Sequence, residues 1–310
     1  MTEPIKIVFL ATPEFATPFL EKLASDHRFQ LLAAITQEDK PVGRKKILTP
    51  PPVKQTSQSL GIQVFQPAKL NKDQALLEEL ENLAPDFLIV VAYGQILSKR
   101  VLQIAKIKPI NVHGSILPKY RGASPIEQAL LNGDQKTGLS IMEMAPSMDT
   151  GAVYQVIESA IEPEDNHLSL RTKLSQLGAN ELPDILVKIK SGELTAKPQN
   201  EADATYCQKI ERQDGLIDPI QLTASQIYNR YRAYCGWPGI FLPFQNKTLK
   251  LLVIHPAKNE SVPSGAFQVE GQKLFLGCSE GTLEITELQM EGKTAQTTSS
   301  FLAGNRQLFS

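Results

Sequence analysis

The chain has 310 residues, of which 42% are hydrophobic and 21% charged, and this balance excludes wholesale disorder. Its length exceeds what one compact core usually holds, so we expect two domains. Lys and Arg number 32 against 33 Asp and Glu, and the net charge of -1 argues by itself against a surface coated with basic charge for nucleic acid. Three cysteines without a Cys-x-x-Cys pair are too few for a disulfide framework and disfavour a thiolate zinc site.

The N-terminal apolar run is short. It extends over residues 5–11, contains one lysine and stops before Thr12-Pro13, so it resembles neither a membrane span nor a secretion signal. No later apolar stretch reaches the length of about 18 residues that a spanning helix needs. We therefore expect a cytoplasmic protein without a membrane partner. The histidines are too scattered for a local metal pattern, and we expect no metal site. They are His27, His113, His167 and His255.

Apolar, strand-like runs alternate with helical patterns over the first half of the chain. We expect strands at residues 5–10, 30–35, 87–91 and 110–112, and helices near 14–24, 71–83 and 124–131. Two further runs, at 139–144 and 152–161, can extend the same sheet, and a long helix near 168–189 can close the domain. This alternation favours an α/β class, with a Rossmann-like parallel-sheet domain and helices on both faces.

The sequence pattern changes after a polar stretch with Gly, Pro and Asn at residues 191–204. A helical pattern near 225–234 precedes short strand-like runs at 248–254, 265–269, 273–277 and 282–288, which suggest a small barrel. We assign residues 1–190 to a catalytic domain, 191–207 to a linker and 208–310 to a small C-terminal β-barrel (OB-like) domain.

Several common motifs are absent. The first strand is followed by Ala11-Thr12-Pro13-Glu14 and not by G-x-G-x-x-G, so a dinucleotide site is unsupported. Glu291-Gly292-Lys293-Thr294 resembles the end of a Walker A loop, but the required first glycine is Glu287. Ser115 lies in His-Gly-Ser-Ile-Leu, which is not an esterase elbow.

The segment 109–151 carries the side chains best suited to chemistry. A strand ends in Asn111-Val112-His113, and alternation along a strand places the asparagine and the histidine on the same side. Both lie at the carboxyl end of the strand, where open α/β sheets bind ligands. A second strand ends in the loop 145–151, which carries Asp149. An amide, an imidazole and a carboxylate can thus converge on one cleft.

These groups suit acyl transfer through a tetrahedral intermediate. The amide N–H of Asn111 can stabilise a developing oxyanion, His113 can donate to it or move a proton, and Asp149 can orient the imidazole. In a plainer interpretation Asn111 caps a loop, His113 is a satisfied buried histidine and Asp149 belongs to an ordinary turn. The plainer interpretation is favoured for each residue alone, and the joint placement brings the two level.

The pattern N-x-H-x-S-x-L-P, at Asn111–Pro118, followed by Asp149-Thr150-Gly151, resembles formyltransferases that use 10-formyltetrahydrofolate. The resemblance implies that Asn111, His113 and Asp149 are the catalytic trio and that 10-formyltetrahydrofolate is the formyl donor. It also implies folate contacts along the Ser-Ile-Leu-Pro element and along an earlier strand and turn. These residues are Ser115, Ile116, Leu117, Pro118, Val90, Val91, Ala92 and Tyr93.

Residues 36–54 resemble the basic insertion of family members that act on methionyl-tRNA, where it engages the acceptor stem. Five Lys and Arg stand here against two Asp and Glu, for a local charge of +3. The resemblance implies tRNA contacts at Lys40, Arg44, Lys45 and Lys46. The plainer alternative is a solvated basic loop.

The resemblance continues through residues 205–219 and 236–244, so it covers nearly the whole chain. It implies that the C-terminal barrel binds tRNA, although residues 206–310 carry ten Lys and Arg against nine Asp and Glu. Candidate phosphate contacts there are Lys209, Arg230, Arg232, Lys247, Lys250 and Arg306.

The function implied by the resemblance is formyl transfer to the methionine of initiator methionyl-tRNA by a cytoplasmic monomer. One alternative is a formyltransferase acting on an aminosugar nucleotide, which the basic insertion disfavours. Another is a noncatalytic tRNA-binding protein, which the intact Asn–His–Asp trio disfavours.

Overall fold

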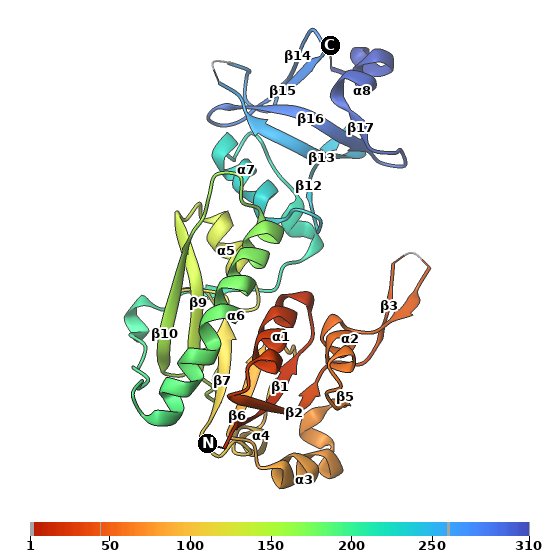
Figure 1. Cartoon of the computed structure of the whole chain (residues 1–310). Coiled ribbons are helices and arrows are strands. Elements are labelled where there is room, and N and C mark those ends of the chain that lie inside the picture. The colour runs from red at the N-terminus through yellow and green to blue at the C-terminus, as the bar shows by residue number, and fades with distance from the viewer. Residues whose placement is uncertain (1–2, 44, 259–260, 310) are drawn as a thin grey trace. The chain divides into compact units, whose positions relative to one another are not determined.

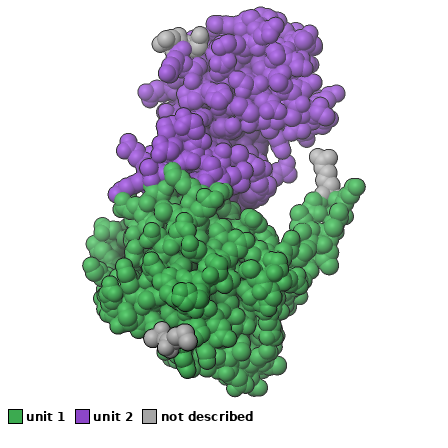
Figure 2. Space-filling view, viewed as in Figure 1, with its two compact units in different colours: residues 1–122, 137–159, 171–207 green, residues 123–136, 160–170, 208–310 purple. Residues whose placement is uncertain are grey.

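The computed structural model of the protein describes residues 3–43, 45–258 and 261–309. The chain divides into two compact units, each built from three stretches of sequence (Figure 2). The first unit comprises Met1–Gly122, Thr137–Ser159 and Arg171–Cys207, and the second comprises Ala123–Lys136, Ala160–Leu170 and Gln208–Ser310. Two short stretches that interrupt the sequence of the first unit, 123–136 and 160–170, therefore belong to the second unit. The domain boundaries assigned from the sequence stay a prediction.

A seven-stranded sheet forms the centre of the first unit (Figure 1), in the order β10-β9-β7-β6-β1-β2-β5. The strands are β1 (Ile5–Ala11), β2 (Phe29–Ile35), β5 (Val64–Phe65), β6 (Phe87–Val91), β7 (Lys108–His113), β9 (Lys136–Glu143) and β10 (Val153–Ala160). Neighbours from β5 to β7 pair in parallel, which confirms the predicted α/β class. In contrast, β9 pairs antiparallel to β7, so the sheet is mixed. The direction of a strand depends on how the preceding loop or helix leads the chain back to the sheet. An apolar run in the sequence does not encode that path.

The order of the strands creates a switch point beside β1. The chain leaves β1 toward β2 on one side and later returns to its other side at β6. Loops from the carboxyl ends of β1 and β6 therefore diverge, which is where open α/β sheets bind ligands. The carboxyl end of β7 lies next to that of β6, because Val90 of β6 is in register with Asn111 of β7.

Helices cover both faces of this sheet, as predicted. On one face, α3 (Gln74–Leu83) and α4 (Lys99–Leu102) share a hydrophobic cluster with Val8 and Leu10 of β1. On the other face, α6 (His167–Ser191) approaches α1 (Thr17–Ser25) and β9 so closely that only glycine fits at position 178. The remaining helix of this unit is α2 (Pro52–Ser59).

Two smaller pairings complete the first unit. Strands β3 (Lys40–Val42) and β4 (Ile47–Thr49) form an antiparallel hairpin that projects away from the large sheet (Figure 1). Strand β8 (Arg121–Gly122) pairs in parallel with β11 (Tyr206–Cys207). The segment predicted to be a linker is thus packed against the first unit. Its Lys197 also forms a bridge with Val153.

The second unit contains an antiparallel sheet, which confirms the predicted small C-terminal β domain. Its strands follow the order β12-β13-β16-β15-β14, with β17 paired to β16. They are β12 (Ile240–Phe244), β13 (Lys247–Pro256), β14 (Phe267–Glu270), β15 (Lys273–Gly277), β16 (Thr282–Met290) and β17 (Gln296–Thr297). Its helices are α5 (Pro125–Leu131), α7 (Ala224–Ala233) and α8 (Thr298–Asn305).

Among the helices in the described ranges, none is long and apolar enough to cross a bilayer.

Replacement of Gly178 by alanine tests the packing of α6. A Cβ at this position would lie 2.3 Å from Cδ1 of Leu139 and 2.7 Å from Cζ of Phe19. Alanine gains about 1 kcal/mol of helix propensity over glycine, but overpacking costs roughly 1–3 kcal/mol. We expect Gly178→Ala to lower the free energy of unfolding by about 1 kcal/mol in urea titrations. Gly304→Ala, in α8 with nothing within 4 Å, is the control and should not be destabilised. Equal stability of the two variants would contradict the close packing.

Replacement of Tyr93 by phenylalanine tests a buried hydroxyl. Tyr93 is 2% exposed within the cluster beneath α3, and its hydroxyl has no hydrogen-bond partner among the described residues. Burial raises the pKa of Tyr93 to about 12. A buried polar group without a partner costs about 1–3 kcal/mol. We therefore expect Tyr93→Phe to stabilise the fold by about 1 kcal/mol in the same titrations. A loss of stability would show that the hydroxyl has a partner.

Candidate active site

Strand β7 presents Asn111 and His113 at its carboxyl end. The two residues are separated by one position, so both side chains lie on the same face of the sheet. His113 is 6% exposed and pairs in register with Ser140 of β9, whereas Asn111 is half-buried. The predicted placement of both side chains at this edge is confirmed by the strand.

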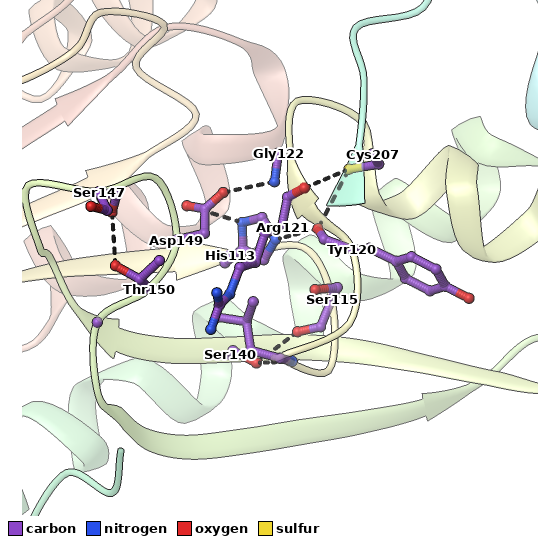
Figure 3. Close-up of polar contacts among 12 residues, drawn as sticks. His113, Ser115, Tyr120, Arg121, Gly122, Ser140, Ser147, Asp149, Thr150 and Cys207 are labelled. Atoms are coloured by element: carbon purple, nitrogen blue, oxygen red, sulfur yellow. Dashed lines mark hydrogen bonds and ion pairs between the residues drawn. The ribbon is translucent and has the colours of Figure 1, made fainter. Parts of the chain in front are cut away.

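Both ring nitrogens of His113 have a polar neighbour (Figure 3). Nε2 lies 2.9 Å from the backbone carbonyl oxygen of Tyr120, and Nδ1 lies 3.6 Å from Oδ1 of Asp149. A carbonyl oxygen only accepts hydrogen bonds, so Nε2 carries the hydrogen. Nδ1 is therefore the nitrogen that can gain or lose a proton. Its distance to Asp149 exceeds that of a direct hydrogen bond and describes an ion pair when the ring is charged.

Asp149 reaches His113 from the loop between β9 and β10. Its backbone is in the left-handed region with φ of 55°, which is uncommon for a residue other than glycine. Its Oδ2 accepts a hydrogen bond of 2.9 Å from the backbone N–H of Gly122, and its side chain is 14% exposed. The loop is tight at its end, because a Cβ at Gly151 would lie 1.7 Å from the carbonyl oxygen of Glu143. The structure thus brings the predicted carboxylate to the predicted imidazole.

Asn111 has a different environment from the other two residues. Among the described residues, its side-chain amide takes part in no hydrogen bond that the structure shows, although the residue is half-buried. Its neighbours in register are Val90 of β6 and Met142 of β9, which are apolar. A half-buried amide with unused donors beside an imidazole suits stabilisation of negative charge on a bound group.

The Ser-Ile-Leu-Pro element folds back on β9. Ser115 has no exposed surface, and its hydroxyl donates to the carbonyl oxygen of Lys119 at 2.6 Å. The hydroxyl of Ser140 donates to the carbonyl oxygen of Ser115 at 2.7 Å and accepts from the N–H of Leu117 at 3.0 Å. Ser115 and Leu117 therefore shape this loop. Ile116 and Pro118 are half-buried, and their folate contacts stay a prediction.

The turn after β6 lies at the switch point of the sheet. The carbonyl oxygen of Tyr93 accepts hydrogen bonds from the hydroxyl of Thr12 at 2.9 Å and from Nε2 of Gln37 at 3.1 Å. The side chains of Val90, Val91 and Tyr93 are buried, whereas Ala92 is exposed and has a φ of 49°. The folate contacts predicted along this strand and turn stay a prediction, and Ala92 is the member of the set with an exposed surface.

A group of residues around Arg121 is absent from the sequence-based prediction. Arg121 is 1% exposed and forms two hydrogen bonds of 2.8 Å with the carboxylate of Glu201. This pairing raises the pKa of Arg121 and lowers that of Glu201. Arg121 also donates to Oε1 of Gln199, at 3.1 Å and 2.8 Å. Both partners lie in a stretch whose polar composition resembles a flexible linker, so the sequence holds no signal for these contacts.

The predicted tRNA contacts lie on the β3–β4 hairpin. Lys40, Lys45 and Lys46 are exposed, and Arg44 lies outside the described residues. Lys54 belongs to the same basic stretch but is paired with Asp39, whose two carboxylate oxygens both lie 2.9 Å from Nζ. The hairpin also exposes the apolar side chains of Val42, Ile47 and Leu48. The tRNA contacts themselves stay a prediction.

One candidate phosphate contact, Arg232, is largely buried in the second unit. Arg232 is 9% exposed, and its guanidinium donates to Oδ1 of Asn229 at 2.8 Å and to three backbone carbonyl oxygens. These carbonyls belong to Glu162, Pro163 and Asp165. Arg232 therefore holds a loop of its own unit, and burial leaves little of it for a phosphate.

In the described part of the chain, no group of three or more His, Cys, Asp and Glu side chains is arranged to hold a metal ion.

Comparison with known proteins agrees with this arrangement. Residues 5–186 match the formyl transferase family, and residues 209–306 match the formyl transferase C-terminal domain. A methionyl-tRNA formyltransferase of Macrococcus caseolyticus is 38% identical over 299 residues, covering 96% of this chain and 95% of the relative. One of Nitratiruptor sp. is 41% identical over 306 residues, covering 97% of each chain.

Among solved structures, a sugar 3N-formyl transferase determined in the presence of dTDP and 5-N-formyl-THF has the same fold. Its TM-score is 0.70 at 18% identity, covering 94% of this chain and 100% of that one. The range that matches the formyl transferase family contains Asn111, His113 and Asp149. The range that matches its C-terminal domain contains the antiparallel sheet. The chain belongs to the formyl transferase family.

Proposed function

We propose that this protein transfers the formyl group of 10-formyltetrahydrofolate to the α-amino group of methionine on initiator methionyl-tRNA. The observation that carries the proposal is the identity of 38–41% to methionyl-tRNA formyltransferases over nearly the whole of both chains. The convergence of Asn111, His113 and Asp149 supports it, because these groups can carry out acyl transfer to an amine. A role in translation initiation supports a cytoplasmic location, and the monomeric state stays a prediction.

A sugar nucleotide is the alternative acceptor. The sugar 3N-formyl transferase shares the fold, but its identity of 18% supports no inference about substrate. The exposed lysines of the β3–β4 hairpin favour an acceptor that carries many phosphates. We therefore favour tRNA over a sugar nucleotide.

The reaction joins an amine nitrogen to the formyl carbon and breaks the bond between that carbon and N10 of the folate. Negative charge builds on the formyl oxygen as the amine adds. The side-chain amide of Asn111 can donate to this oxygen, because its N–H groups are not used within the described protein. A half-buried donor stabilises the charge more than water would, since the local dielectric constant is lower.

Proton movement falls to His113 and Asp149. The amine must lose one proton, and the leaving N10 must gain one. Because Nε2 of His113 is tied to the carbonyl of Tyr120, Nδ1 is the atom that can exchange the proton. Asp149 lies 3.6 Å from Nδ1 and stabilises the charged ring. The pair thus works as a proton relay beside the oxyanion donor.

The formyl donor supplies the activated one-carbon group, and the described residues offer a place for it. The switch point between β1 and β6 adjoins the carboxyl end of β7, where Asn111 lies. Ala92, Ile116 and Pro118 present surface there and would hold the folate, while Val91 and Ser115 shape the backbone behind them.

Removal of the acid–base pair tests the proposed roles. We expect His113→Ala and Asp149→Asn each to lower kcat by roughly 100- to 10,000-fold, because general acid–base catalysis contributes about that much. The measurement is formyl transfer from 10-formyltetrahydrofolate to charged initiator tRNA, compared with charged elongator tRNA. The control is His27→Ala, whose ring is 97% exposed. Turnover of either variant within a few-fold of His27→Ala would refute the assignment.

Removal of the hairpin charges tests the acceptor. We expect Arg44→Ala, and the double variant Lys45→Ala/Lys46→Ala, to raise KM for tRNA by roughly 10-fold and to leave KM for the folate unchanged. Each lost phosphate contact should also reduce the salt dependence of tRNA binding by about one unit of slope. Lys72→Ala, an exposed lysine elsewhere in the first unit, is the control. If KM for tRNA and the salt dependence of tRNA binding are both unchanged, the hairpin takes no part in tRNA recognition.

A further inference from the structure

Residues 199–207 hold both members of the His113–Asp149 pair. On the histidine side, the hydroxyl of Thr205 accepts from the N–H of Tyr120 at 2.9 Å, and its carbonyl accepts from the N–H of Arg121 at 2.8 Å. These contacts fix the peptide whose carbonyl binds Nε2 of His113. The thiol of Cys207 donates to the same carbonyl, that of Tyr120, at 3.4 Å.

On the aspartate side, the contact is made by Gln199. Its Nε2 donates to the backbone carbonyl oxygen of Asp149 at 2.7 Å and to that of Gly151 at 2.8 Å. The first of these carbonyls belongs to the residue with a φ of 55°, and the second lies two residues further along the same loop. A left-handed backbone at a residue other than glycine persists only where the surroundings hold it. Gln199 supplies such a restraint from a segment 50 residues further along the chain.

Arg121 determines which way the amide of Gln199 points. The guanidinium can only donate, so the atom that faces it must be the amide oxygen. It approaches this oxygen through Nε at 3.1 Å and Nη2 at 2.8 Å. The amide nitrogen is then directed at the two loop carbonyls. Glu201 keeps Arg121 in place with two hydrogen bonds of 2.8 Å.

We propose that Gln199 is a positioning residue for formyl transfer, which sets the main chain at Asp149 so that the carboxylate faces Nδ1 of His113. The inference rests on the proposed function of the Asn–His–Asp trio. Gln199 acts on the carboxylate through the backbone of Asp149. Its side-chain amide must accept hydrogen bonds from Arg121 and, at the same time, donate hydrogen bonds to the loop that carries Asp149.

Two substitutions separate these tasks. Gln199→Glu keeps an oxygen for Arg121 and removes both donors to the loop. Gln199→Met has a similar size and removes the acceptor as well as the donors. Gln30→Glu, at an exposed position of β2, makes the same chemical change away from the site and serves as control. Initial rates with both substrates varied give kcat and the two KM values, and thermal unfolding gives the stability of each variant.

We expect kcat to fall roughly 10- to 100-fold in both Gln199 variants, because small displacements of a catalytic group cost rates of this order. Both KM values should stay within about threefold of the parent protein, since Gln199 acts on the catalytic pair and not on binding. Gln199→Glu should unfold at a lower temperature than the control, because its carboxylate still accepts from Arg121 but leaves the two loop carbonyls without a donor. Amide hydrogen exchange at Gly122, whose N–H donates to Oδ2 of Asp149, should be faster in both variants.

Three results would overturn the inference. A kcat of Gln199→Glu equal to that of Gln30→Glu, with a loss confined to Gln199→Met, would mean that Gln199 only satisfies Arg121. Unchanged kcat in both variants would remove Gln199 from the mechanism. Unchanged exchange at Gly122 would show that Asp149 is held without Gln199. Absence of formyl transfer by the parent protein would refute the proposed function, and the exchange rates would then decide the structural part alone.

Discussion

The hydrogen bond from Nε2 of His113 to the carbonyl of Tyr120 determines how the rest of the site can work. It fixes the tautomer of the ring and leaves Nδ1 as the nitrogen that can exchange a proton. Asp149 lies on the Nδ1 side and is itself anchored by the N–H of Gly122, one residue beyond Arg121. One short piece of chain, Tyr120–Gly122, therefore orients both the His113 ring and the Asp149 carboxylate. Substitution within this piece is severely limited, because a Cβ at Gly122 would lie 2.0 Å from the carbonyl oxygen of Cys207.

The buried guanidinium of Arg121 explains why the segment after α6 is ordered. A buried charge is costly unless it is paired and fully hydrogen-bonded. Here Glu201 supplies the opposite charge, and Gln199 supplies a further acceptor. The ring of Tyr206 lies 6.0 Å from the guanidinium carbon. The stretch with the composition of a linker is thereby joined to the loop that carries Asp149.

The sequence predicts the elements that depend on the periodicity of apolar residues. It does not predict the parts of the site that depend on polar contacts between residues far apart in the chain. The apolar runs at β1, β2 and β6 and the leucine stripe of α3 predict their elements, because burial imposes the period. The Asn–His spacing predicts a shared face, because alternation in a strand is strict. By contrast, Gln199 contacts Asp149 across a gap in sequence that no local pattern reveals. Likewise, Arg232 is of a residue type that often contacts phosphate, but it donates to backbone carbonyls of a loop that is distant in sequence.

The charge of the whole chain is a poor guide to binding of nucleic acid. Charges on a surface act over about 8–10 Å at physiological salt, so the local balance matters more than the sum. The basic stretch before α2 is partly neutralised by the pair between Lys54 and Asp39, which leaves the exposed lysines at the tip and base of the β3–β4 hairpin. These lysines stand beside exposed Val42, Ile47 and Leu48. Apolar side chains on a projecting basic hairpin are costly in water, and they gain a partner where a base or a sugar face accompanies the phosphates. A net charge of -1 is therefore compatible with one concentrated contact to tRNA.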